Sequence, residues 1–85
     1  IGYCLRASAK MRLGKWAEAR ADIDLIARAR PATPEVYIVR GAWNQAHYRL
    51  HEALDDYAKA ISLNPRLREP YLRRSLIHYF QGKLN

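Results

Sequence analysis

The chain has 85 residues, enough for one small domain with a modest hydrophobic core. Hydrophobic residues make up 49% of it, which excludes a disordered chain, and no apolar run approaches the roughly 18 residues of a membrane span. The formal net charge is +7, with eleven arginines and four lysines, and this balance favours acidic partners.

Cys4 is the single cysteine, so the sequence excludes an internal disulfide. A lone cysteine fits a reducing compartment and slightly favours a cytoplasmic location, although the localisation is otherwise unknown. The chain begins at Ile1 rather than at methionine, and we therefore expect the natural N-terminus to lie upstream.

Five helices are expected, and the first two cover residues 2–13 and 16–29. Gly14 lies between them, where the chain must reverse between antiparallel helices. Glycine suits this position because it adopts a positive φ without steric cost.

The third helix is expected over residues 35–47. Thr33 is a suitable N-cap, and Pro34 fits the first position of a helix. Glu35 follows, where a carboxylate is favoured by the positive end of the helix.

The fourth and fifth helices are expected over residues 50–63 and 69–81. The pair Asn64-Pro65 ends the fourth helix, because a residue that precedes proline is disfavoured in the α conformation. The pair Glu69-Pro70 opens the fifth helix by the same argument. Gly82 then lies where the chain would turn again.

The sequence repeats itself with a period of 34 residues. The residues that recur in register are Tyr3, Tyr37 and Tyr71; Arg6, Arg40 and Arg74; Ala19 and Ala53; Asp22 and Asp56; and Pro31 and Pro65. Agreement in several columns excludes chance and divides the chain into a first repeat over residues 1–33, a second over 34–67 and a partial third over 68–85.

The second repeat carries the clearest pattern. Its matching residues are Tyr37-Ile38-Val39-Arg40-Gly41, Leu50, Glu52-Ala53-Leu54, Asp56-Tyr57, Ala60-Ile61, Leu63 and Asn64-Pro65. This stretch resembles the tetratricopeptide repeat, in the variety common in bacteria, and the likeness extends over essentially the whole chain. It implies an all-α superhelix of stacked antiparallel hairpins, with about 2.5 repeats that share a core. It also implies a protein-interaction scaffold that binds a partner in a concave groove, and no enzyme.

Two departures from the family pattern lead to structural expectations. Tyr48 stands where the family has glycine at the turn, so we expect a strained or differently wound turn there. Polar residues stand where the family prefers a large aromatic side chain and should loosen the hairpins; they are Lys10, Asn44 and His78. Trp43 and Ile77, each one place earlier, would supply the missing bulk.

An arginine recurs at a position that faces the hairpin interior, where many family members carry leucine. The second helices bring aspartates, which are Asp22 in the first repeat and Asp55 or Asp56 in the second. We therefore predict that Arg6 and Arg40 form partly buried ion pairs or cap carbonyl groups. An anion-binding ladder of arginines is the alternative.

The resemblance assigns groove residues to the first helix of each repeat. They are Cys4, Ser8, Met11 and Arg12; then Glu35, Ile38, Ala42, Gln45 and Ala46; and then Glu69, Leu72, Arg73, Leu76, Tyr79 and Phe80. The third set is the most apolar. It forms either a hydrophobic peptide groove or a surface that covers a missing sixth helix or a homodimer contact, and for its last turn we favour the covering role.

One binding mode of the family can be tested by position. Some chaperone-binding relatives hold the C-terminal carboxylate of a peptide with lysines, asparagines and an arginine. The matching positions here are Cys4, Ser8, Val39, Glu69 and Arg73. Only Arg73 fits, so the sequence disfavours such a carboxylate clamp.

Metal, enzymatic and nucleic-acid sites are weaker interpretations. His47 and His51 straddle the expected turn and have no third ligand nearby except Glu52, so no metal or cofactor is expected. No nucleophile has a neighbouring base. The alternative function is binding of RNA or another polyanion by a basic run, which comprises Arg66, Arg68, Tyr71, Arg73 and Arg74. No pair of residues that could read bases recurs with the 34-residue period, so binding of nucleic acid is disfavoured. The expected partner is a protein or peptide of acidic or amphipathic character.

Overall fold

The computed structural model describes the backbone of residues 2–84 and the side chains of residues 6–82. Over this part of the chain there are five α-helices and no strand, so the expected all-α class is confirmed. The helices are α1 (Gly2–Arg12), α2 (Trp16–Ala29), α3 (Pro34–Ala46), α4 (Leu50–Leu63) and α5 (Glu69–Leu84). The ends of α1 to α4 agree with the expected ones to within one residue. Within the described range, none of the helices has both the length and the apolar character that a membrane crossing requires.

Helix α5 is longer than the sequence predicts. We expected it to end at residue 81 with a turn at Gly82, but it continues to Leu84, so the expected turn is wrong. A β-carbon at Gly82 would have no neighbouring atom within 4 Å. No packed segment therefore opposes the helix at this point, and its hydrogen bonding continues through the glycine.

Tight turns reverse the chain inside the hairpins α1–α2 and α3–α4. Gly14 has a φ of 79° and Tyr48 a φ of 59°, so both lie in the left-handed region. This conformation is free for glycine but costs energy for tyrosine, and the expected strain at Tyr48 is confirmed. Thr33 occupies the N-cap position of α3 in extended backbone, as expected, but its side chain makes no capping hydrogen bond.

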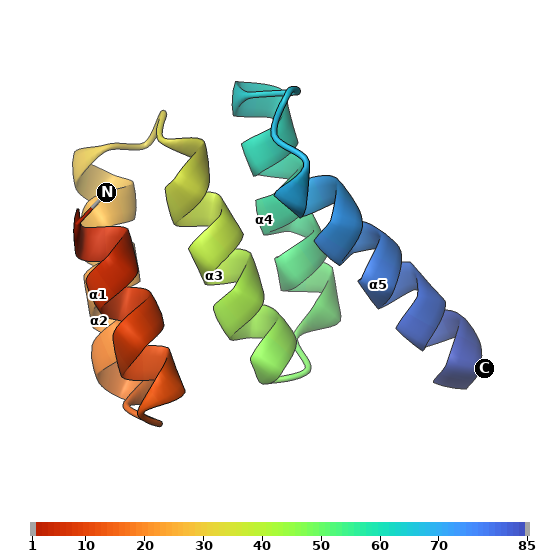
Figure 1. Cartoon of the computed structure of the whole chain (residues 1–85), viewed down its shortest axis with the longest axis horizontal. Helices are drawn as coiled ribbons and strands as arrows, with labels where there is room; N and C mark the ends of the chain where they lie inside the picture. The colour runs from red at the N-terminus through yellow and green to blue at the C-terminus, as the bar shows by residue number, and fades with distance from the viewer. Residues whose placement is uncertain (1, 85) are drawn as a thin grey trace.

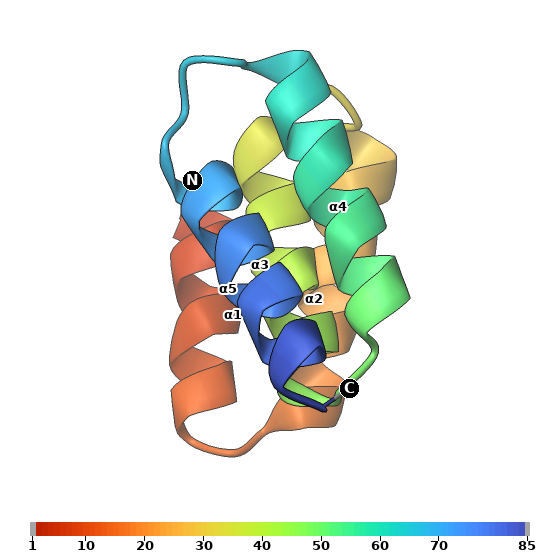
Figure 2. The ribbon, with the colours of Figure 1, turned by 90° about the vertical axis from the view of Figure 1, so that its right-hand side faces the viewer.

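The helices form two layers (Figure 1, Figure 2). Helices α1, α3 and α5 make one layer, and α2 and α4 make the other. Helix α1 packs with α2 and α3 with α4 as hairpins, while α3 also contacts α2 and α5 contacts α4. The body is flattened, with extents of 36 × 29 × 17 Å, and the two ends of the chain lie toward opposite ends of the long axis.

Buried clusters join each helix to the next. The first cluster links α1, α2 and α3, the second links α3 and α4, and the third links α4 and α5. Their buried members are, in that order, Ala7, Ile23, Ile26 and Val36; Tyr37, Ile38 and Ala60; and Ala53, Tyr57 and Ile77. Trp43 packs against the first cluster, so the prediction that Trp43 and Ile77 supply the missing bulk is confirmed.

Gly41 sets the approach of α3 to α4. A β-carbon at this position would lie 2.5 Å from a ring carbon of Tyr57, which is closer than any side-chain contact allows. The two helices therefore pack at this distance only because the residue is glycine. Ala7, at the equivalent position of the first repeat, is likewise fully buried.

Candidate functional site

An aspartate of the second helix closes the first hairpin. Asp22 accepts a hydrogen bond from Nζ of Lys10 at 2.9 Å, and Nε of Arg6 lies 3.5 Å from the same carboxylate. The hydrogen bond from Lys10 holds the pKa of Asp22 below its usual value, although burial acts in the opposite direction. The predicted ion pair of Arg6 is confirmed.

The second hairpin repeats this arrangement with a different second donor. Asp56 accepts a hydrogen bond from Nε of Arg40 at 2.9 Å and another from Nδ2 of Asn44 at 2.8 Å. The predicted ion pair of Arg40 is thus confirmed as well. Asn44 and Asp56 are both buried, so the carboxylate is held by donors from α3 on both of its oxygens.

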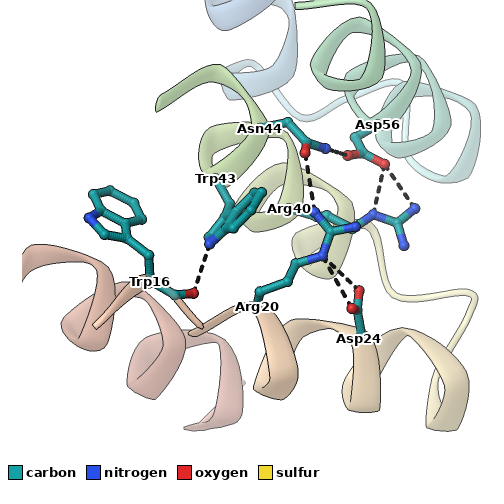
Figure 3. A network of polar contacts seen from close by, with 7 residues as sticks. All are labelled: Trp16, Arg20, Asp24, Arg40, Trp43, Asn44 and Asp56. Carbon is teal, nitrogen blue, oxygen red and sulfur yellow. Dashed lines mark hydrogen bonds and ion pairs between the residues drawn. The ribbon is translucent and has the colours of Figure 1, made fainter. Parts of the chain in front are cut away.

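A chain of polar contacts continues from Asn44 into the first hairpin (Figure 3). Nη1 of Arg20 donates to Oδ1 of Asn44 at 3.2 Å, and Nε of Arg20 lies 3.1 and 3.2 Å from the two carboxylate oxygens of Asp24. Close by, Nε1 of Trp43 donates to the backbone carbonyl of Trp16 at 2.9 Å. Sequence reasoning missed Arg20, because the residue 34 positions later is a leucine and no periodic signal marks it.

His47 packs against two indole rings at the turn end of the hairpins. Its ring centroid lies 3.9 Å from that of Trp43, in a stacked arrangement, and 4.9 Å from that of Trp16, edge-on. Its Nδ1 lies 2.8 Å from the carbonyl oxygen of Trp43. In the part of the chain that the structure describes, no group of three His, Cys, Asp or Glu residues is placed to hold a metal ion.

The predicted groove residues all come from the layer of α1, α3 and α5 (Figure 1). Those that are at least partly exposed are Ser8, Met11, Arg12, Glu35, Ala42, Gln45, Ala46, Glu69, Leu72, Arg73, Leu76, Tyr79 and Phe80. Ile38 differs, because it is buried against Ala60 and Leu67 and offers little surface to a ligand. The side chain of Cys4 lies outside the described residues.

Exposed apolar side chains follow one face of α5. Leu72, Leu76, Tyr79 and Phe80 are 64%, 59%, 65% and 43% exposed. Their spacing along the helix places them on a common face, and we call this set the α5 strip. A contiguous apolar surface of this kind is typical of an interaction site.

The α5 strip is distinct from the surface by which α5 packs on the rest of the chain. That packing surface contains Pro70 and Ile77, which are both almost fully buried. They stand 34 residues after Val36 and Trp43, which pack α3 onto the first hairpin. Helix α5 therefore stacks on the second hairpin as α3 stacks on the first.

The α5 strip overlaps in part with the surface that would receive a second helix in a hairpin. In α3, Ile38 and Gln45 are among the residues that meet α4. Their equivalents, 34 residues later, are Leu72 and Tyr79, which belong to the strip. Leu76 and Phe80 instead follow Ala42 and Ala46, which are at least partly exposed on α3. The periodicity therefore favours the groove interpretation for Leu76 and Phe80 and the covering role for Leu72 and Tyr79.

Polar contacts border the α5 strip on the side of α3. The hydroxyl of Tyr57, which reaches this border from α4, donates to Oε1 of Gln45 at 2.9 Å. The guanidinium of Arg73 lies beside the same hydroxyl, and its Nε donates to Oε2 of Glu69 at 3.0 Å. Burial raises the pKa of Tyr57 to about 12, although the charge of Arg73 acts in the opposite direction.

The basic run considered as an alternative polyanion site is partly engaged within the chain. Arg73 is paired with Glu69, and the guanidinium carbon of Arg74 lies 5.6 Å from the ring centroid of Tyr71. Arg66 and Arg68 are exposed. The Tyr71 side chain remains 38% exposed beside Arg74.

Comparison with known proteins gives one informative match. The chain is similar to a solved structure described as the first TPR of Spaghetti (RPAP3) bound to the HSP90 peptide SRMEEVD. The TM-score is 0.82 and the sequence identity is 32%, over 91% of this chain and 61% of that one. The chain thus spans less than two thirds of the length of this neighbour. No model of a known protein family matches the chain, and no curated protein does.

Proposed function

Since this chain has the fold of a tetratricopeptide-repeat domain, we propose that it is an interaction module that binds a peptide or protein on the face of α1, α3 and α5. A structural neighbour with this fold is bound to a peptide. The observation that carries the proposal is the α5 strip on the same layer as α1 and α3, beside the polar side chains of Gln45 and Arg73. Apolar surface with a few placed polar groups is what a peptide site requires.

The proposed binding mode does not use a carboxylate clamp. Glu69 stands where chaperone-binding relatives have lysine, and it is paired with Arg73, which is the one clamp position that fits. A peptide carboxylate would have to displace Glu69 and would then face its negative charge. Recognition of a free C-terminus is therefore disfavoured, and apolar contacts along α5 supply the affinity.

The division into repeats is part of the same proposal. With boundaries at residues 34 and 68, each repeat contributes its first helix to the binding face: α1 from the first, α3 from the second and α5 from the third. The fold is that of an interaction scaffold, and we propose no catalytic role.

Nuclear magnetic resonance can test this function directly. Linear peptides selected from a random display library on the immobilised chain would be titrated into isotope-labelled protein. We expect the amide signals of α1, α3 and α5 to shift, including those of residues 72–80, while those of α2 and α4 change little. Shifts confined to α2 and α4, or a library that yields no binder, would contradict the proposal.

A further inference from the structure

The α5 strip lies in a strongly basic part of the chain. From Asn64 to Asn85 the sequence contains five basic residues and one acidic residue, which gives this segment +4 of the total net charge of +7. The five are Arg66, Arg68, Arg73, Arg74 and Lys83, and the acid is Glu69. An apolar strip in a segment rich in basic side chains is complementary to a partner whose apolar surface is flanked by acidic side chains.

The border of the α5 strip offers few groups that could bind the backbone of a ligand. An extended peptide brings N–H and C=O groups that need partners wherever they become buried. The polar side chains here are Gln45, whose Oε1 accepts the bond from Tyr57, and Arg73, whose Nε donates to Glu69. Their remaining polar atoms can hold a few groups of a ligand, but not the whole row that an extended backbone presents. Asn44 is buried in the network between the hairpins. An α-helix, by contrast, satisfies its own backbone and needs only side-chain contacts.

We propose that the α5 strip binds an amphipathic α-helix of another protein, with acidic residues along the edges of its apolar face. This inference rests on the proposed function, because it names the class of partner for the same surface. From Leu72 to Phe80 the strip spans about 12 Å, or roughly two helical turns, which matches apolar anchors at i, i+3 or i+4, and i+7.

The probes are designed amphipathic peptides of about 16 residues, with leucine anchors at helical spacing and glutamates along both edges. Their binding to the whole chain is measured by fluorescence anisotropy. A matched set carries a central proline, which breaks the helix, and a second set carries lysine in place of glutamate. We expect the proline set and the lysine set each to bind roughly tenfold more weakly, and the lysine effect to shrink in high salt.

Two variants of the chain test the place of binding. Leu76→Asp puts a charge in the α5 strip, and Leu25→Asp puts the same charge on α2, where the leucine is 60% exposed against 59% for Leu76. We expect Leu76→Asp to weaken binding of the acidic helix by roughly tenfold or more and Leu25→Asp to change it by less than about twofold. Circular dichroism and thermal unfolding confirm that both variants are folded.

The outcomes separate this inference from the proposed function. If proline-containing peptides bind as well as helical ones and Leu76→Asp still weakens both, the partner is extended and the inference is overturned, while the proposed function stands. If the chain binds no peptide of either kind, both are overturned. Both are also overturned if light scattering shows a dimer that Leu76→Asp converts to a monomer and Leu25→Asp does not, because a second copy then occupies the α5 strip.

Discussion

At the residue scale, Asp22 and Asp56 hold equivalent places in their hairpins, and each receives two donors from the preceding helix. The arginine donors could be predicted from the sequence because arginine and aspartate both recur in register. The second donors, Lys10 and Asn44, could not be predicted, because they differ in type and stand where the family prefers a large aromatic residue. Removing the hydrogen-bond donors of a buried carboxylate lowers the free energy of unfolding by about 1–3 kcal/mol or more, which explains why positions 10 and 44 carry polar side chains.

Tyr57 should make stability depend on alkaline pH. Its pKa rises from 10.0 to about 12 on folding because the ring is buried. The stabilising effect of the neutral hydroxyl is fully present below pH 10 and is lost as the pH rises through 12, because the unfolded chain releases the proton first. We expect Tyr57→Phe to lack this loss, so that from pH 9 to pH 12 the wild type loses up to about 2 kcal/mol of unfolding free energy relative to the variant.

Urea denaturation followed by circular dichroism at both pH values measures this difference. All residues other than position 57 are common to both proteins, so their contributions cancel in the comparison. If the unfolding free energy of both proteins fell by the same amount between pH 9 and pH 12, folding would not raise the pKa of Tyr57.

At the scale of the elements, helix positions were predictable because caps, prolines and apolar spacing are local signals. The surroundings of single residues were not. The family pattern predicts Ile38 at the binding face, but it is buried in a cluster with Tyr37 and Ala60, against which Leu67 of the loop after α4 packs. Helix α5 continues through Gly82 because no other segment packs against it there. The local sequence pattern carries no information about such tertiary contacts.

Two glycine-to-alanine variants should have opposite effects. Gly41→Ala places a β-carbon 2.5 Å from the Tyr57 ring, so α3 and α4 must separate, and we expect a loss of about 2–3 kcal/mol in unfolding free energy. Gly82→Ala meets nothing within 4 Å and favours the helical backbone of α5, so we expect a gain of about 0.5–1 kcal/mol. Chemical denaturation of both variants would reveal the two signs, and equal effects would refute the close approach at Gly41.

At the scale of the whole molecule, the contacts from Asp24 through Arg20, Asn44 and Asp56 to Arg40 join α2, α3 and α4 (Figure 3). They therefore tie the first hairpin to the second through polar groups as well as through the apolar cluster around Val36. Stacked repeats gain cooperativity from such interfaces between neighbours. Sequence comparison within the chain could not find this contact, because it joins different positions of two different repeats.

Asn44→Leu should weaken this coupling. The change leaves Asp56 without one of its donors and removes the acceptor of Nη1 of Arg20, so we expect a loss of about 2–3 kcal/mol. We also expect a smaller dependence of the unfolding free energy on urea concentration, because the hairpins unfold less cooperatively. Hydrogen exchange should show α1 and α2 opening separately from α4. Arg28→Leu, at an exposed position of α2, is the control, and if it matched Asn44→Leu in both measurements the coupling would have another origin.

The contact of Arg20 with Asn44 also limits how this chain could be lengthened by gene duplication or protein engineering. In an array of identical copies of residues 34–67, the residue opposite each Asn44 would be Leu54, which stands 34 positions after Arg20. Every internal junction would then bury an amide oxygen against a leucine side chain. The two hairpins are therefore not interchangeable parts, and a longer array made from this sequence would need an arginine restored at position 54 of every copy that precedes another.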